Sequence, residues 1–286
     1  MRYPLFVITL SGLLLQACSD ERSIGRATSV PPQAELQNAL SRQRELTSAP
    51  NGMSPAFTQP SEPYFSGGGD RVLMIGDSLS VGGFGQSMQE YLVSRFGQNN
   101  VAVFAACGSS PQHWLRSGSD YTTKCGYREQ TPSTAILYDF QHGRRPPPMP
   151  TPKLDDLLPK YRPTILIVQL GTNWMDGLVT DARDEETDAR TLDGFVAAIR
   201  ASPSTVRKII WITPPDSSHY PPRVQQAVLA LIKAAAAKYG FETINSSAIT
   251  HYTPGKSGGD GVHYADEPAK EWASLVRIQL DHIVRY

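Results

Sequence analysis

Residues 71–80 read RVLMIGDSLS, a short apolar run followed by a glycine and, two positions later, a serine. The apolar run is typical of a strand buried within a parallel sheet. Gly76 allows a sharp backbone turn where the run ends, and apolar residues at helical spacing follow from about 80 to 96. Ser78 is therefore expected at the carboxyl edge of an open α/β sheet, where such folds bind ligands and perform chemistry. An ordinary Asp-Ser turn is the alternative for this segment taken alone.

A base for this serine is suggested by the glycine-rich stretch GGDGVHY at residues 258–264. Asp260 precedes His263 by three positions, so the carboxylate can reach the imidazole if the loop turns. A serine nucleophile needs such a base, and the base needs a partner that fixes its tautomer. The alternative is that Asp260 only caps the loop and that His263 is an ordinary surface residue.

Two further strand ends carry groups that could bind a negatively charged oxygen. An apolar run at residues 101–107 ends at Gly108, and another at residues 165–170 ends at Gly-Thr-Asn, residues 171–173. A glycine at a strand end leaves its backbone N–H accessible, and the Asn173 amide can donate a second hydrogen bond. A tight turn at Gly108 and a helix N-cap at Asn173 are the alternatives.

Together and in this order, these four sites resemble the SGNH hydrolases, also called the GDSL esterase/lipase family. The first block of that family matches residues 76–79, and the second matches Gly108. The third block matches residues 171–173, and the fifth, Asp-x-x-His, matches Asp260 and His263. The resemblance extends from the first strand to the C-terminus.

The resemblance implies a serine esterase that needs no metal and no cofactor. Ser78 would attack the ester, His263 would take its proton, and Asp260 would hold the imidazole. The oxyanion would be bound by the backbone N–H groups of Ser78 and Gly108 and by the Asn173 amide. The sequence carries no Cys-x-x-Cys or His-Glu-x-x-His motif that would indicate a metal site.

Asp77, Trp114 and Trp174 are expected to bind the substrate. Trp174 stands where the family has an Asp, which puts the shape of the site beside the oxyanion hole in question. Trp114 lies at the start of an insertion, about 111–161, that follows Gly108 closely and contains aromatic and arginine side chains. Such side chains suit a sugar surface or an anionic group. The alternative is that the insertion only covers the edge of the sheet.

The rest of the pattern predicts a single α/β domain over residues 70–286. Strand-like runs at about 208–213 and 241–245 flank an alanine-rich helical segment at 222–239. Strands that alternate with helices indicate a parallel sheet covered on both faces. The family resemblance implies a flavodoxin-like, three-layer α/β/α domain with a five-stranded parallel sheet in the order 2-1-3-4-5.

The first 17 residues resemble a lipoprotein signal peptide. Their apolar run is short for a membrane span, and residues 15–18, LQAC, resemble a lipobox that would leave Cys18 as a lipidated N-terminus. A plain secretory signal, and hence a secreted protein, is the alternative, because Gln16 is larger than the usual small residue. Residues 18–69 are expected to be a flexible tether. The lipid would anchor the domain to a membrane of the bacterial cell envelope, on the periplasmic face of the outer membrane.

The cysteine count fits this location. The chain has three cysteines. If Cys18 carries a lipid, Cys107 and Cys125 remain as a pair in an oxidising compartment and are expected to form a disulfide. Two unpaired buried thiols are the alternative.

Composition excludes one class of partner. The 27 basic residues equal the 27 acidic ones, so no excess of positive charge points to nucleic acid.

The chain is expected to be a monomer. Its expected substrate is an acylated carbohydrate, of the peptidoglycan or xylan type, or another ester. An O-acyltransferase or a lipase would use the same triad. A non-catalytic glycan-binding lipoprotein is the alternative from another class, and the intact Ser78, Asp260 and His263 argue against it.

Overall fold

The computed structural model describes residues 69–123, 125–139, 146–181, 184–202 and 205–285. The expected signal peptide, Cys18 and all but the last residue of the expected tether lie outside these residues. Within the described part of the chain, no helix is both long enough and apolar enough to cross a membrane.

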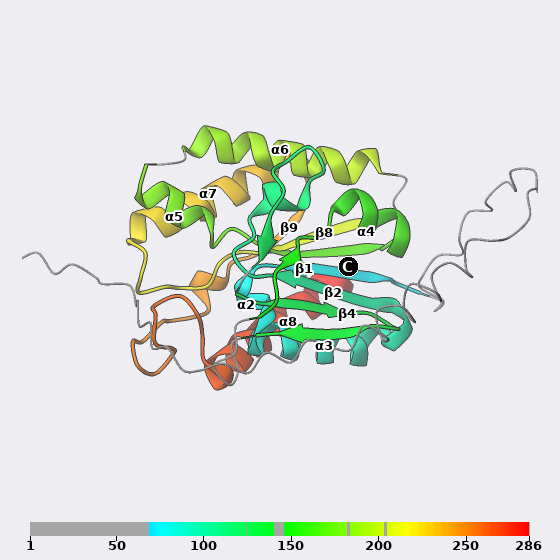
Figure 1. The fold of residues 1–286 in the computed structure, drawn as a ribbon, viewed down its shortest axis with the longest axis horizontal. Helices are drawn as coiled ribbons and strands as arrows, with labels where there is room; N and C mark the ends of the chain where they lie inside the picture. Colours follow the sequence, from blue (N-terminus) through cyan, green and yellow to red (C-terminus); the bar gives the residue numbers. More distant parts are fainter. Residues whose placement is uncertain (1–68, 124, 140–145, 182–183, 203–204, 286) are drawn as a thin grey trace, which may run out of the picture. The chain divides into compact units, whose positions relative to one another are not determined.

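A seven-stranded sheet forms the centre of the fold, in the order β5-β4-β2-β1-β7-β8-β9 (Figure 1). The parallel strands are β1 (Val72–Gly76), β2 (Val101–Ala106), β7 (Ile165–Gln169), β8 (Lys208–Ile212) and β9 (Glu242–Ile244). Their order, β2-β1-β7-β8-β9, is the predicted 2-1-3-4-5 and confirms the α/β fold class. Because parallel strands end at one edge of a sheet, the turns that follow β2, β1 and β7 meet there.

The prediction of five strands is wrong by two, and both additional strands come from the insertion. They are β4 (Tyr127–Gln130), which pairs antiparallel with β2, and β5 (Ala135–Tyr138), which pairs antiparallel with β4. A five-stranded sheet would leave unpaired the N–H and C=O groups of β2 that point away from β1, and β4 pairs with this edge. The insertion also forms a two-stranded sheet of β3 (Thr122–Thr123) and β6 (Met149–Pro150). The structure therefore supports the alternative in which the insertion covers the sheet edge.

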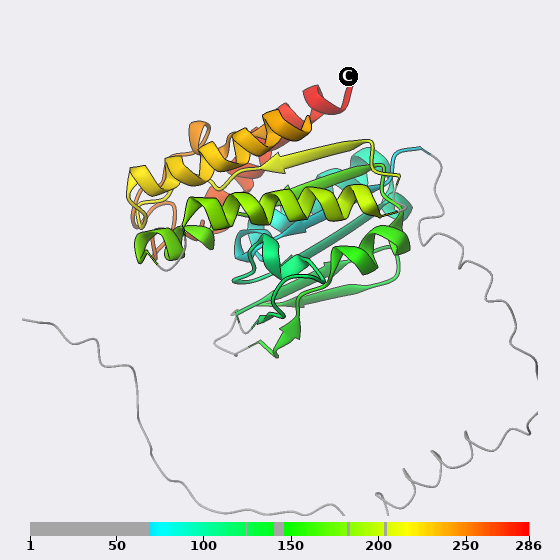
Figure 2. The ribbon, with the colours of Figure 1, turned by 90° about the horizontal axis from the view of Figure 1, so that it is seen from above.

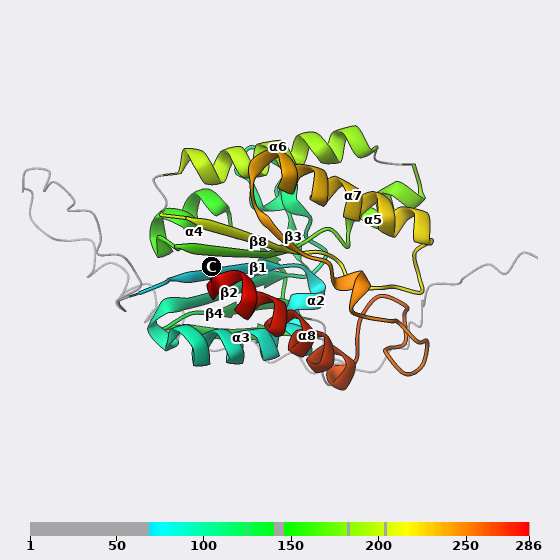
Figure 3. The same ribbon diagram turned by 180° about the vertical axis from the view of Figure 1, so that it is seen from behind.

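Helices cover both faces of the sheet, as predicted (Figures 1 and 3). One face carries α3 (Gly83–Phe96) and α8 (Asp266–Arg285). The other carries α4 (Leu154–Tyr161), α5 (Trp174–Val179), α6 (Glu185–Ala201) and α7 (Pro222–Tyr239). Figure 2 shows α6 and α7 side by side over this second face. Short 3-10 helices are η1 (Gln98–Asn100), η2 (Pro111–Trp114) and η4 (Ser246–Ala248).

The side chains of β1 explain why its sequence is apolar throughout. Leu73 and Ile75 belong to the core beneath α4 to α7, whereas Val72 and Met74 belong to the core beneath α3 and α8. All four side chains are fully buried. A strand covered on both faces cannot alternate polar with apolar residues, so the continuous apolar run is what this position requires.

The helical segment after β1 is interrupted, unlike the single helix expected from about 80 to 96. A short helix, α2 (Ser78–Val81), is followed by Gly82 in a non-helical conformation, with a φ of −81° and a ψ of −148°, and then by α3. Gly85 has to be a glycine, because a Cβ there would lie 1.7 Å from the Ser80 carbonyl oxygen. This close approach sets the angle between the helix that starts at Ser78 and the helix that packs on the sheet.

Candidate active site

The turn between β1 and α2 presents Ser78 as the first residue of a helix. Asp77 is the N-cap, and its Oδ1 accepts a hydrogen bond of 3.0 Å from the Leu79 N–H. Gly76 cannot be replaced without rearrangement, since a Cβ there would lie 2.3 Å from the Ser80 Oγ. Among the described residues, the Ser78 N–H donates no hydrogen bond, so it is free to bind a negatively charged oxygen.

Ser78, His263 and Asp260 form one hydrogen-bonded chain. The Ser78 Oγ lies 2.9 Å from the His263 Nε2, and the His263 Nδ1 lies 2.6 Å from the Asp260 Oδ2. The other carboxylate oxygen, Oδ1, accepts the backbone N–H groups of Val262 and His263 at 2.9 and 2.8 Å. The fold thus brings together residues that are 185 positions apart in the chain. This is the connectivity that lets a histidine accept a proton from a serine.

The environment of Asp260 keeps its carboxyl group ionised. Partial burial by itself would raise the pKa of Asp260, but the hydrogen bonds from the His263 ring and from the two backbone N–H groups lower it below its ordinary value. An ionised carboxylate at this distance stabilises the imidazolium that forms when His263 takes a proton.

Gly108 and Asn173 lie at the ends of the two strands that flank β1. Gly108 follows β2 with a φ of +79°, and within the described residues its N–H donates no hydrogen bond. The Asn173 Nδ2 donates one hydrogen bond of 2.9 Å to the Ser109 carbonyl oxygen. An amide NH₂ has two hydrogens, so one can still be donated to a substrate. The expected oxyanion donors therefore stand at the same sheet edge as Ser78.

The prediction that Asp77, Trp114 and Trp174 bind the substrate is wrong, because all three side chains are fully buried. Asp77 caps α2. The Trp114 Nε1 donates to the Ser109 Oγ at 3.0 Å, and the Trp174 Nε1 donates to the Gln112 Oε1 at 3.1 Å. Both indoles belong to the core beneath α4 to α7. They support the loop after β2 from below and do not face a ligand.

The carboxyl group of Asp77 is strongly perturbed. Its burial raises the pKa of Asp77 to about 6, although the hydrogen bond from the Leu79 N–H works in the opposite direction. The unfavourable burial of this carboxylate therefore occurs in the turn that positions Ser78.

The predicted disulfide between Cys107 and Cys125 is present, with a Cα–Cα distance of 5.5 Å. The Tyr121 hydroxyl donates to the Cys107 carbonyl oxygen at 3.1 Å. A Cβ on Gly108 would lie 2.1 Å from that hydroxyl. The disulfide and Tyr121 together fix the backbone that leads into Gly108.

Arg128 is a supporting residue whose role the sequence did not reveal. Arg128 lies on β4 and is only 1% exposed. The Nε and Nη2 donate to the Val81 carbonyl oxygen at 3.0 and 2.7 Å, and the Nη1 donates to the Gln86 Oε1 at 2.9 Å. Arg128 therefore caps the last residue of the helix that begins with Ser78. No local sequence signal could have identified this contact, because Arg128 and Val81 are 47 residues apart.

The described residues contain no group of three or more His, Cys, Asp or Glu side chains arranged to hold a metal ion.

Comparisons with known proteins agree with this geometry. A family model described as GDSL-like Lipase/Acylhydrolase matches residues 72–276. A comparison with curated proteins by sequence gives no match. Solved structures with a similar fold include a candidate arylesterase of Agrobacterium tumefaciens, at 14% identity and a TM-score of 0.50 over 75% of this chain and 99% of the other.

Two further structures have the same TM-score of 0.50. One is the esterase EstA of a Pseudoalteromonas species, inhibited by monoethylphosphonate, at 16% identity over 76% of this chain and 100% of the other. The second is a variant of an acetyl-xylooligosaccharide esterase of Geobacillus, at 13% identity over 74% of this chain and 95% of the other. At these identities the likeness shows the fold.

Proposed function

Because this chain belongs to the GDSL-like lipase/acylhydrolase family and is a serine ester hydrolase, we propose that Ser78 is its nucleophile, His263 its general base and Asp260 the partner of the base. The observation that carries the proposal is the continuous hydrogen-bonded chain from the Ser78 Oγ through both nitrogens of the His263 ring to the Asp260 Oδ2. Such a chain holds the imidazole with one nitrogen facing the nucleophile and the other facing a carboxylate.

The reaction proceeds in two halves. The Ser78 Oγ attacks the ester carbonyl carbon while the His263 Nε2 accepts the hydroxyl proton. The carbon–oxygen bond to the alcohol breaks, and His263 returns the proton to the departing alcohol. A water molecule then attacks the acyl-serine and loses a proton to His263. His263 returns this proton to the Ser78 Oγ as the bond between that oxygen and the acyl carbon breaks, and the acid is released.

Three donors stabilise the oxyanion of each tetrahedral intermediate. They are the free N–H groups of Ser78 and Gly108 and the remaining amide hydrogen of Asn173. Donors that are fixed before the reaction starts lower the barrier without reorganisation. In this site Gly108 is fixed by the disulfide and Asn173 by its bond to Ser109.

The substrate we propose is an O-acetyl group on a carbohydrate, of the peptidoglycan or xylan type. The side chains of His263 and Asp260 are 49% and 55% exposed, so the base and its partner lie on an open surface. An open surface admits a bulky glycan chain, whereas a long acyl chain needs an enclosed apolar groove. The Geobacillus enzyme shows that a protein of this fold can act on an acetylated oligosaccharide.

Acetate release tests the proposal. The purified protein is incubated with O-acetylated peptidoglycan and with acetylated xylan, beside Ser78→Ala and the control Ser94→Ala, whose exposed serine lies on α3. We expect release from one glycan, unchanged in the control and reduced by a factor on the order of 10⁶ in Ser78→Ala. Acetate release by Ser78→Ala equal to that of the wild type would refute the assignment of Ser78 as the nucleophile. Transfer of acetate to an added sugar would identify an acyltransferase, and activity on long-chain esters alone would identify a lipase.

We also propose that the enzyme is anchored by a lipid on Cys18 in the bacterial cell envelope. The support is the lipobox-like sequence LQAC at residues 15–18. Metabolic labelling with a radioactive fatty acid, followed by membrane fractionation, tests it. We expect the wild-type protein to carry the label and the Cys18→Ser variant to carry none. Recovery of unlabelled wild-type protein from the culture medium would show secretion instead.

A further inference from the structure

The loop that carries Asp260 and His263 is held by two buried hydroxyl groups from outside it. They belong to Ser217, in the loop between β8 and α7, and to Tyr252, which follows η4. Ser217 is 8% exposed and Tyr252 is 3% exposed. Neither side chain forms a hydrogen bond with the ring of His263 or with the carboxylate of Asp260 within the described structure. Each hydroxyl instead contacts backbone groups of the loop.

Tyr252 binds the loop at two points. Its hydroxyl accepts the Gly261 N–H at 3.0 Å and donates to the His263 carbonyl oxygen at 3.3 Å. The loop also closes tightly around this hydroxyl, because a Cβ on Gly258 would lie 2.4 Å from it. One buried oxygen thus joins the backbone groups on either side of Val262.

Ser217 binds the other side of the same glycine. Its Oγ donates to the Gly261 carbonyl oxygen at 2.6 Å, and the backbone N–H groups of Ser218 and His219 donate to that oxygen at 3.0 and 3.3 Å. Gly261 has a φ of +83°, a conformation that other residues adopt at a cost. Its peptide groups are therefore fixed on both sides, directly between Asp260 and His263.

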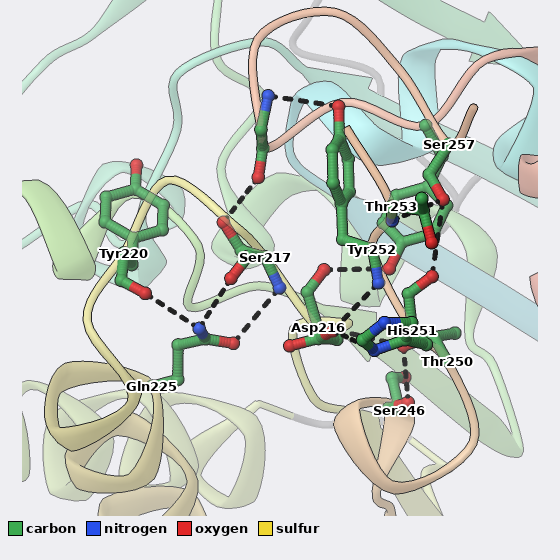
Figure 4. Close-up of polar contacts among 12 residues, drawn as sticks. Asp216, Ser217, Tyr220, Gln225, Ser246, Thr250, His251, Tyr252, Thr253 and Ser257 are labelled. Carbon is green, nitrogen blue, oxygen red and sulfur yellow. Dashed lines mark hydrogen bonds and ion pairs between the residues drawn. The ribbon is translucent and has the colours of Figure 1, made fainter. Parts of the chain in front are cut away.

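Both hydroxyl-bearing residues form further hydrogen bonds, Ser217 with α7 and Tyr252 with the loop between β8 and α7 (Figure 4). Gln225 on α7 accepts the Ser217 N–H at 3.2 Å and donates to the Ser217 carbonyl oxygen at 2.8 Å. The Asp216 Oδ2 accepts the Tyr252 N–H at 2.8 Å. Figure 4 shows Ser217 beside Gln225 at the start of α7 and Asp216 beside Tyr252. Hydrogen bonds therefore run from Gln225 on α7, through Ser217, to Gly261 in the loop that carries Asp260 and His263.

We propose that Tyr252 and Ser217 are positioning residues that hold His263 and Asp260 in register with Ser78. The inference rests on the proposed function, since it assigns the two residues to the same triad. Asp260 accepts the N–H groups of Val262 and His263 only while the turn keeps its shape. Loss of either hydroxyl removes one of the hydrogen bonds that fix Gly261, and a displacement of about 1 Å at a reacting group can cost on the order of 10²-fold in rate.

The test uses Tyr252→Phe and Ser217→Ala in the full chain, with an acetyl ester as substrate. We expect kcat to fall roughly 10- to 100-fold with KM changed less than about threefold, because neither residue touches the substrate. The rate at which a phosphonate probe labels Ser78 should fall by the same factor as kcat. Ser217→Thr, which keeps the hydroxyl, should restore most of the rate.

Tyr91→Phe is the matched control. The Tyr91 hydroxyl donates a single hydrogen bond of 2.7 Å to the Asp281 Oδ1, between α3 and α8. This variant loses a comparable bond away from the loop, and its kcat should stay within about twofold of the wild type. The control separates positioning from a general loss of stability.

The outcomes distinguish the inference from the function on which it rests. Full kcat in Tyr252→Phe or in Ser217→Ala, with Ser78→Ala inactive, would overturn the positioning role and leave the triad intact. An active Ser78→Ala would overturn the proposed function instead. If Tyr252→Phe does not fold, Ser217→Ala and its threonine counterpart decide the question, because a kcat loss that threonine does not rescue would also overturn the inference.

Discussion

Asp77 gives a quantitative prediction about the turn that carries Ser78. Its carboxyl group is fully buried, and burial raises the pKa of Asp77 from 3.8 to about 6. A raised pKa means that the folded protein favours the protonated form. The contribution of this group to stability is therefore fully present below pH 3.8 and is lost as the pH rises through about 6. This rise of about two pKa units corresponds to a loss of about 3 kcal/mol in the free energy of unfolding at alkaline pH.

The perturbation is Asp77→Asn, which removes the titration and keeps a side-chain oxygen for the Leu79 N–H. Asn caps helices about as well as Asp, so the exchange should have little effect at low pH. Linkage predicts that the free energy of unfolding of the variant, relative to the wild type, rises by about 2 kcal/mol between pH 4.5 and pH 8.

Urea unfolding of both proteins at several pH values measures this difference directly. Other titrating groups occur in both proteins, so their contributions cancel in the comparison. A difference that stays constant from pH 4.5 to pH 8 would refute the argument, and so would one that falls as the pH rises.

Three further predictions concern the groups around the nucleophile. Asn173→Ala should lower kcat roughly 10²- to 10³-fold in ester hydrolysis assays, because it removes one oxyanion donor; a loss under threefold would exclude the amide from the oxyanion hole. Removal of the Cys107–Cys125 disulfide by double Ser substitution should cost about 3 kcal/mol in urea unfolding, for a loop whose ends are 18 residues apart; unchanged stability would contradict the entropic account. Arg128→Met should cost about 2 to 4 kcal/mol in the same measurement, because Val81 loses both guanidinium hydrogen bonds; a neutral result would show that water replaces the cap.

Features encoded in short stretches of sequence were predictable. The parallel strands followed from apolar runs that alternate with helical patterns, whereas their order followed from the family resemblance, and the structure has them in that order. The turn at Gly76 placed Ser78 at the sheet edge, and the spacing of Asp260 and His263 allowed the carboxylate to reach the imidazole; the structure joins all three residues. In each case the deciding contacts are local or follow from the family resemblance.

Features that depend on distant packing were not predictable. Trp114 and Trp174 carry the same apolar surface whether they face a sugar or the core, and only the position of α4 to α7 decides between the two. The extra strands β4 and β5 arise because β2 would otherwise have a free edge, which no residue within the insertion signals. Tyr252 lies 11 residues from His263 with no motif to connect them, so its hydrogen bond to that residue appears only in the fold.

The most direct test of the account is the site of covalent modification by an ethyl phosphonate probe, mapped by peptide mass spectrometry. If Ser78 is the nucleophile, one adduct forms, on Ser78, and its formation parallels the loss of esterase activity. No adduct forms in Ser78→Ala, and the reaction is strongly slowed in His263→Ala, since no imidazole accepts the proton. An adduct on another residue, or unchanged labelling and activity in Ser78→Ala, would contradict the central claim.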